Sequence, residues 1–149
     1  SNISLLFVGD GPEKSKIQNH ALKKNINIIF TGFVNQTDIS MYYSIADVNI
    51  IISDYDPSPK AINEAMNFKL PIIVSDVVGT SSDLVFDGKN GFIIKCGDID
   101  SLSKKLEYFN LNREQIKIMG QKSFDIVQKW NYRENVNGIM KAFNHCFKS

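Results

Sequence analysis

Residues 53–76 read SDYDPSPKAINEAMNFKLPIIVSD and combine an acidic loop, the start of a helix and an apolar strand. The run just before them, residues 48–52, is mostly apolar and predicts a buried strand. Asp54 and Asp56 therefore lie at the carboxyl end of that strand, which is where open α/β sheets bind ligands. The loop that carries these two carboxylates is a candidate ligand-binding site.

The helix that follows this loop is predicted over residues 59–68. Ser58 is a favourable N-cap residue, and Pro59 then occupies the first helical position, where its missing N–H costs nothing. Three backbone amides of the first turn would lack partners within the helix: those of Lys60, Ala61 and Ile62. Free amides and the positive end of the helix dipole together predict a place for phosphate.

Glu64 lies about one turn further along the helix, on a mostly apolar surface with Ala61, Ala65 and Phe68. If that surface faces inward, the carboxylate needs hydrogen-bond donors, and sugar hydroxyls are such donors. Each feature also has a structural alternative. Lys60 and Glu64 are four residues apart and could form a surface pair, and the acidic loop residues could be ordinary turn residues.

Strands and helices alternate over the first two thirds of the chain. Apolar runs predict strands at residues 3–8, 26–30, 48–52, 71–74 and 92–94, with helices at 12–24, 35–45 and 59–68 and a short helix ending near residue 85. From residue 98 onward only helices are predicted, at 98–108, at 113–129 and up to about 147, with Trp130 as a packing residue. This order favours a Rossmann-like, doubly wound α/β fold with a mostly parallel sheet and a helical carboxyl terminus.

Composition narrows the class of protein. The 149 residues, 43% hydrophobic and 22% charged, suffice for one globular domain, and a net charge of +1 gives no reason to expect nucleic acid as a partner. Cys96 and Cys146 lack the spacing of a metal site, so reduced thiols and a cytoplasmic location are predicted. No apolar run approaches the roughly 18 residues of a membrane-spanning helix.

A family resemblance begins at Asp56. This residue, seven further residues, Glu64-Ala65-Met66 and the strand LPIIVSD together resemble the signature of glycosyltransferase family 4, a large retaining group with the GT-B fold. The Gly-Asp-Gly-Pro turn at residues 9–12 and Asp-Gly-Lys-Asn-Gly at residues 87–91 are also similar to family sequences. Asp56 stands where the family usually has Glu, and Pro59 stands where it often has Gly.

The resemblance implies a donor-binding domain. Residues 1–149 would be the carboxyl-terminal half of a GT-B enzyme, without its first strand and helix and without its acceptor domain. The implied reaction is retaining transfer from a nucleoside diphosphate sugar to a glycan or lipid-linked acceptor, which would bind through the missing amino-terminal domain. No metal or other cofactor is expected, and the resemblance leaves room for peripheral membrane association of the full enzyme.

The resemblance also assigns roles to individual residues. Asp56 and Glu64 would be catalytic, with Asp56 holding hydroxyls of the donor sugar and Glu64 accepting hydrogen bonds from the ribose. The remaining donor-binding residues would be Gly32, Phe33 and Val34 beside the base, Ser58, Lys60 and Ala61 at the phosphates, and Gly79 and Thr80 beside the sugar and diphosphate.

Three alternatives remain at this point. The first is a nucleotide-sugar binding module without turnover, of which Asp56 and Pro59 would be signs. The second is a nucleotide-sugar epimerase of the same fold. The third is a receiver domain that binds Mg²⁺, although such a domain needs an acidic pair after its first strand and only Asp10 is found there.

Overall fold

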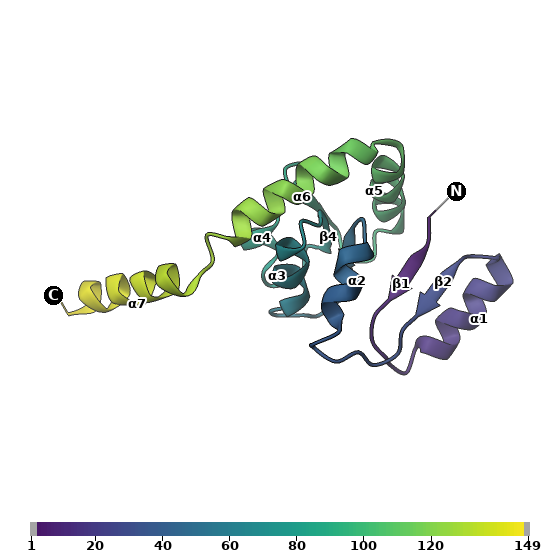
Figure 1. The fold of residues 1–149 in the computed structure, drawn as a ribbon, viewed down its shortest axis with the longest axis horizontal. Helices are drawn as coiled ribbons and strands as arrows, with labels where there is room; N and C mark the ends of the chain where they lie inside the picture. Colours follow the sequence, from purple (N-terminus) through teal and green to yellow (C-terminus); the bar gives the residue numbers. More distant parts are fainter. Residues whose placement is uncertain (1–2, 148–149) are drawn as a thin grey trace. The chain divides into compact units, whose positions relative to one another are not determined.

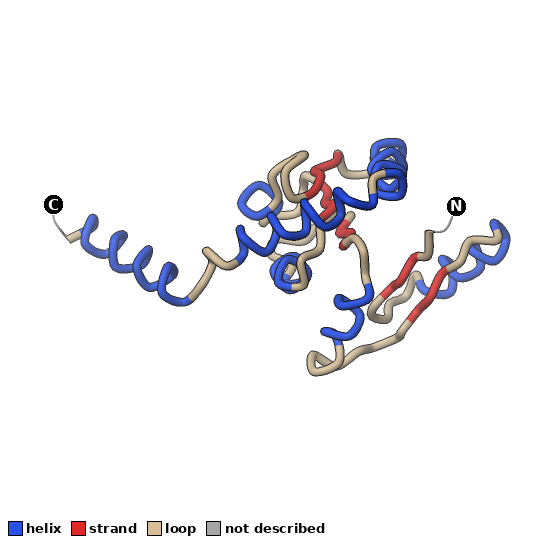
Figure 2. The backbone as a smooth tube through the Cα atoms, turned by 45° about the horizontal axis from the view of Figure 1, so that its top comes forward, coloured by secondary structure: helices blue, strands red, loops and turns tan. Residues whose placement is uncertain are grey.

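The computed structural model describes residues 3–147 and shows an α/β chain. The predicted single domain consists of two compact units, divided between Ile45 and Ala46. Strands alternate with helices as far as β5, and only helices follow it (Figure 1). Figure 2 shows the same alternation, with short strands and longer helices along the backbone.

The first unit contains two strands and two helices. They are β1 (Leu5–Phe7), α1 (Lys14–Lys24), β2 (Ile28–Phe30) and α2 (Ile39–Ile45). The strands pair in parallel, with Phe7 opposite Phe30, and the rings of these two residues stack with their centroids 5.0 Å apart. Helix α1 ends at Asn25, whose left-handed backbone lets its amide and that of Ile26 bond the last carbonyls of the helix.

The second unit is built on a parallel sheet of three strands in the order β3-β4-β5. Its elements are β3 (Asn49–Ile51), α3 (Lys60–Asn67), β4 (Ile72–Ser75), α4 (Ser81–Leu84), β5 (Gly91–Ile94), α5 (Ile99–Leu111), α6 (Arg113–Val127) and α7 (Tyr132–Cys146). All four residues of the central strand β4 are buried, as expected for a parallel strand covered on both faces.

The core of the second unit lies between this sheet and the helices α3, α5 and α6. Helix α3 buries Ile62, Ala65 and Met66, and a further apolar cluster comprises Ile73, Phe92, Ile94, Phe109, Ile116 and Met119. Helix α6 comes very close to the end of α3, since a Cβ atom on Gly120 would lie 1.9 Å from the carbonyl oxygen of Lys69.

The helix start at α3 differs from the prediction. The N-cap residue is Pro59, with an extended backbone, and Ser58 makes no capping hydrogen bond. The amide of Ser58 instead donates to Oδ1 of Asp56 over 3.2 Å, so an Asx-type turn delays the helix by one residue. The amide of Ile62, predicted to be free, donates to the carbonyl of Pro59 over 3.3 Å.

Helix α7 extends beyond the end of α6 (Figures 1 and 2), and all of its residues are exposed. Trp130, in the short connection before α7, is 54% exposed. Trp130 was predicted to be a packing residue, but more than half of its surface is exposed.

Candidate functional site

Two loops meet at the carboxyl ends of β3 and β4. Asp56 and Val78 form a parallel bridge, and the amide of Gly79 donates to the carbonyl of Asp56 over 2.9 Å. The loops can come this close only because Gly79 has no side chain, since a Cβ atom there would lie 2.1 Å from the carbonyl oxygen of Pro57. The predicted site residues Asp56, Ser58, Gly79 and Thr80 are thus brought together by the backbone.

The first turn of α3 begins at the same place. Within residues 3–147, the backbone amides of Lys60 and Ala61 have no hydrogen-bond acceptor. These are the orphan donors of a helix start, and the positive end of the helix dipole lies beside them. Lys60 is exposed, while Ala61 and Glu64 are half-buried on the same helix. This arrangement can hold an anionic group at the helix start.

Thr80 adds an unused polar group. Its Oγ1 atom is buried and has no hydrogen-bond partner within the part of the chain that the structure describes. A buried hydroxyl without a partner costs free energy, so a ligand that bonds it would gain what the folded chain leaves unsatisfied. Thr80 is the residue next to Gly79, whose amide contacts the loop of Asp56.

Asp76 follows the end of β4, and its carboxylate accepts hydrogen bonds from the two residues that follow β5. Oδ2 accepts from Nζ of Lys95 over 2.7 Å, and Oδ1 accepts from the amide of Cys96 over 3.0 Å. The Lys95 ammonium and then the Cys96 amide hold the pKa of the Asp76 carboxyl below its ordinary value. Asp76 thus joins the ends of β4 and β5 at the rim of the candidate site.

Asp76→Asn is expected to lower the melting temperature at neutral pH. Because folding depresses the pKa of Asp76, its stabilisation is present above the ordinary pKa of about 4 and is lost as the pH falls through the folded value. The difference in melting temperature between the two proteins should therefore shrink below about pH 4. Thermal unfolding from pH 7 down to pH 3 checks this, and a difference that is independent of pH would contradict it.

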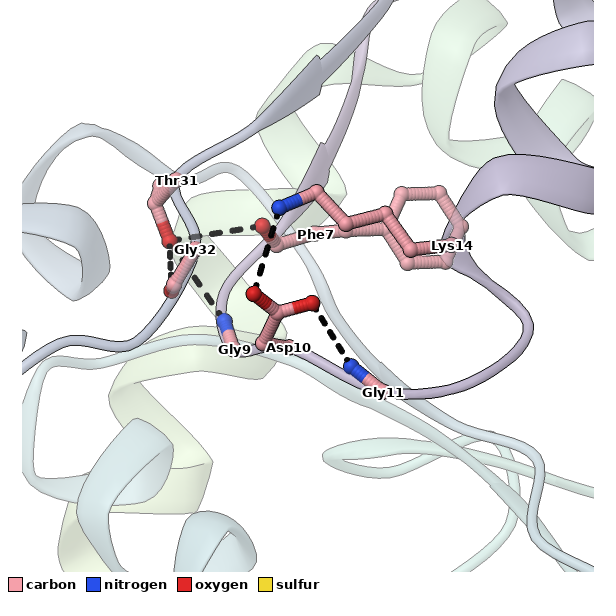
Figure 3. Close-up of polar contacts among 7 residues, drawn as sticks. All are labelled: Phe7, Gly9, Asp10, Gly11, Lys14, Thr31 and Gly32. Atoms are coloured by element: carbon pink, nitrogen blue, oxygen red, sulfur yellow. Dashed lines mark hydrogen bonds and ion pairs between the residues drawn. The ribbon is translucent and has the colours of Figure 1, made fainter.

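The other predicted donor residues belong to the first unit. Gly32 has a positive φ of 71°, and its carbonyl accepts from the amide of Gly9 and the hydroxyl of Thr31 (Figure 3). Phe33 is 82% exposed, so it does not cover the core. Contact of Gly32, Phe33 and Val34 with a nucleotide base stays a prediction.

The Gly-Asp-Gly turn at residues 9–11 has a structural role. The Asp10 carboxylate accepts from the amide of Gly11 over 2.9 Å and from Nζ of Lys14 over 3.3 Å (Figure 3). The Gly11 amide, followed by Lys14, lowers the pKa of Asp10 below its ordinary value. The carboxylate therefore stabilises its own turn and the start of α1.

None of the helices within residues 3–147 is both long and apolar enough to cross a membrane. His, Cys, Asp and Glu side chains in that range do not gather in groups of three that could hold a metal ion.

The fold is similar to that of solved glycosyltransferases. A mutant of S. aureus TarM, whose crystal structure is a complex with fondaparinux, alpha-GlcNAc-glycerol and UDP, matches with a TM-score of 0.84 and 23% identity, over 95% of this chain and 29% of that chain. Likenesses of this kind show a Rossmann-like half of a GT-B fold and confirm the predicted α/β class.

The sequence assigns the family. The chain belongs to the glycosyl transferases group 1 family, whose model matches residues 1–125. It is 28% identical over 131 residues to sulfoquinovosyl transferase SQD2 of Arabidopsis thaliana, covering 87% of this chain and 25% of that protein. It is 33% identical over 122 residues to alpha-monoglucosyldiacylglycerol synthase of Acholeplasma laidlawii, covering 78% and 26%. The chain thus spans about a quarter of the length of these two relatives.

Proposed function

We propose that this chain binds the nucleoside diphosphate sugar of a retaining glycosyltransferase, which transfers the sugar to a glycan or lipid-linked acceptor. The observation that carries the proposal is the contact between the loops of Asp56 and Gly79 beside the free amides of α3. The Asp56 carboxylate and the Thr80 hydroxyl, which suit sugar hydroxyls, belong to these two loops, and the free amides, which suit phosphate, begin the helix that follows the first loop.

The start of α3 would hold the diphosphate. The amides of Lys60 and Ala61 point along the helix dipole, and the Lys60 ammonium adds a positive charge nearby. Glycosyl transfer places negative charge on the leaving diphosphate, and dipoles already fixed in position stabilise that charge without reorganising. Pro59 offers no amide, so phosphate binding begins at Lys60.

The carboxylates would hold hydroxyls. The Asp56 side chain is oriented by the Ser58 amide on Oδ1, and a carboxylate has further acceptor positions for hydroxyls of the donor sugar. Glu64, half-buried one turn into α3, would accept hydrogen bonds from the ribose. The unpaired hydroxyl of Thr80 would bond the sugar or the diphosphate. No metal or other cofactor is required by this scheme.

The chain would act as one part of a larger enzyme. In the full enzyme, an amino-terminal domain would bind the acceptor. One relative, named for a glucosyldiacylglycerol product, favours a lipid-linked acceptor.

Calorimetric titration with UDP, GDP, ADP and inorganic pyrophosphate, with and without Mg²⁺, tests this function. We expect saturable binding of one nucleoside diphosphate that does not depend on Mg²⁺. Glu64→Ala should weaken this binding by about 1–3 kcal/mol, or roughly 5- to 150-fold, because the ribose loses its acceptor.

The matched control is Glu107→Ala, which removes an exposed carboxylate from α5 and should leave the affinity unchanged. Equal binding of pyrophosphate and all three nucleotides would contradict nucleotide recognition. Unchanged affinity in Glu64→Ala would contradict the role of Glu64. Binding without transfer by a chain extended to the length of its relatives would instead favour the module without turnover.

A further inference from the structure

A pocket of about 540 Å³ lies where α3, the end of α6 and the start of α7 meet. Its volume falls within the range of small-molecule sites. Five of its eight lining residues carry side-chain amides, two are aromatic and none is charged. The amides belong to Asn63, Asn67, Gln128, Asn131 and Asn135, and the aromatic residues are Trp130 and Tyr132.

Some of the amide side chains that line the pocket form hydrogen bonds within the chain. Nε2 of Gln128 donates to Oδ1 of Asn67 over 3.2 Å, and Nδ2 of Asn67 donates to the carbonyl of Asn63 over 2.8 Å. Asn131 caps α7 by accepting from the amide of Glu134 over 3.1 Å. These bonds fix α3 to the end of α6 and fix the direction in which α7 begins.

The other amides are unused. Within residues 3–147, no hydrogen bond involves the side chains of Asn63 or Asn135. Each amide offers two donor hydrogens and an acceptor oxygen, so the pair presents both kinds of group to a bound molecule. A ligand whose own groups both donate and accept, as hydroxyls do, matches these amides.

The aromatic residues are open to the same ligand. Trp130 is 54% exposed and Tyr132 is 91% exposed, although large aromatic rings usually gain stability by burial. A flat ring beside polar amides suits a sugar, because one face of a pyranose carries C–H groups and its rim carries hydroxyls. The absence of charge among the lining residues disfavours phosphates and uronic acids.

We propose that this pocket binds a neutral oligosaccharide, at a place separate from the loops of Asp56 and Gly79. The C–H face of one sugar would lie on Trp130, and the amides of Asn63 and Asn135 would bond its hydroxyls. A role for the pocket in holding the acceptor or product glycan rests on the function proposed above. Binding of the oligosaccharide itself does not depend on that function.

The fluorescence of Trp130 reports on this pocket directly, because it is the single tryptophan of the chain. The full chain would be titrated with maltotriose and with triacetylchitotriose as neutral probes, and with trigalacturonate and UDP as charged probes. We expect a saturable spectral change with at least one neutral probe and none with trigalacturonate. No saturable change with either neutral probe would overturn the proposal, as would an equal response to UDP.

Variants separate this site from a general effect on the fold. In calorimetry, Trp130→Ala should abolish binding of the neutral probe, and Asn63→Ala or Asn135→Ala should weaken it about tenfold. Asn19→Ala, on the exposed surface of α1, is the matched control and should bind normally. Nucleotide binding should persist in all four variants. Full affinity for the oligosaccharide in Trp130→Ala would contradict the assignment.

Discussion

Gly79→Ala is expected to weaken binding of the nucleoside diphosphate more than about tenfold and to destabilise the fold by about 1–3 kcal/mol. The new Cβ atom would lie 2.1 Å from the carbonyl oxygen of Pro57 and 2.9 Å from its carbonyl carbon. Both are backbone atoms, so relief requires one loop to move away from the other. That movement breaks the hydrogen bond from the Gly79 amide to Asp56 and displaces the Asp56 carboxylate.

Calorimetry and thermal unfolding of the same preparation measure the two effects. Gly11→Ala is the matched control, because a Cβ atom on Gly11 meets nothing within 4 Å and its backbone needs no positive φ. This control should bind and unfold as the parent chain does. If Gly79→Ala bound the nucleotide with full affinity, the contact between the two loops would have no part in donor binding.

Asn90→Ala is expected to lower the free energy of unfolding by about 3 kcal/mol and the melting temperature by about 10 °C. The Asn90 side chain is fully buried. Its Oδ1 accepts from the amide of Phe86 over 2.8 Å, and its Nδ2 donates to the carbonyl of Leu84 over 3.0 Å. Alanine would leave both backbone groups without these partners in the turn before β5, and the Leu84 carbonyl would be buried.

Ser123→Ala provides the comparison, since it removes a smaller part of the same network. The Ser123 hydroxyl donates to the carbonyl of Asn90 over 3.2 Å and accepts from its Nδ2 over 3.4 Å. Its loss should cost about 1 kcal/mol. Chemical denaturation measures both values, and a change below about 0.5 kcal/mol for Asn90→Ala, which is typical of surface positions, would contradict the role of this network.

Much of the fold could be predicted because its signals are local. Apolar runs mark the strands, and β4 was expected at 71–74 and is found at Ile72–Ser75. The meeting of the Asp56 and Gly79 loops follows from parallel pairing, which places the ends of neighbouring strands at one edge. The start of α3 was misplaced by one residue because the Asx-type turn of Asp56 competes with the Ser58 cap.

Other features depend on residues that are far apart in sequence. Asn90 belongs to the Asp-Gly-Lys-Asn-Gly stretch at residues 87–91, yet its side chain bonds Ser123, 33 positions away. Asp76 and Lys95 form an ion pair although they are 19 positions apart, and nothing in the local sequence around either residue predicts it. Trp130 is a large aromatic residue of the kind that usually packs in a core. It is exposed because the chain turns away from the second unit's core after α6. These three features depend on tertiary structure, so patterns in the local sequence could not predict them.

Amide chemical shifts, recorded while the nucleotide that binds in calorimetry is added to the isotopically labelled chain, would locate it on the fold. The donor-site assignment predicts that the largest changes occur at Lys60, Ala61, Gly79 and Thr80, where free amides and the two loops meet. Saturable changes confined to other residues, with these four amides unmoved, would contradict it.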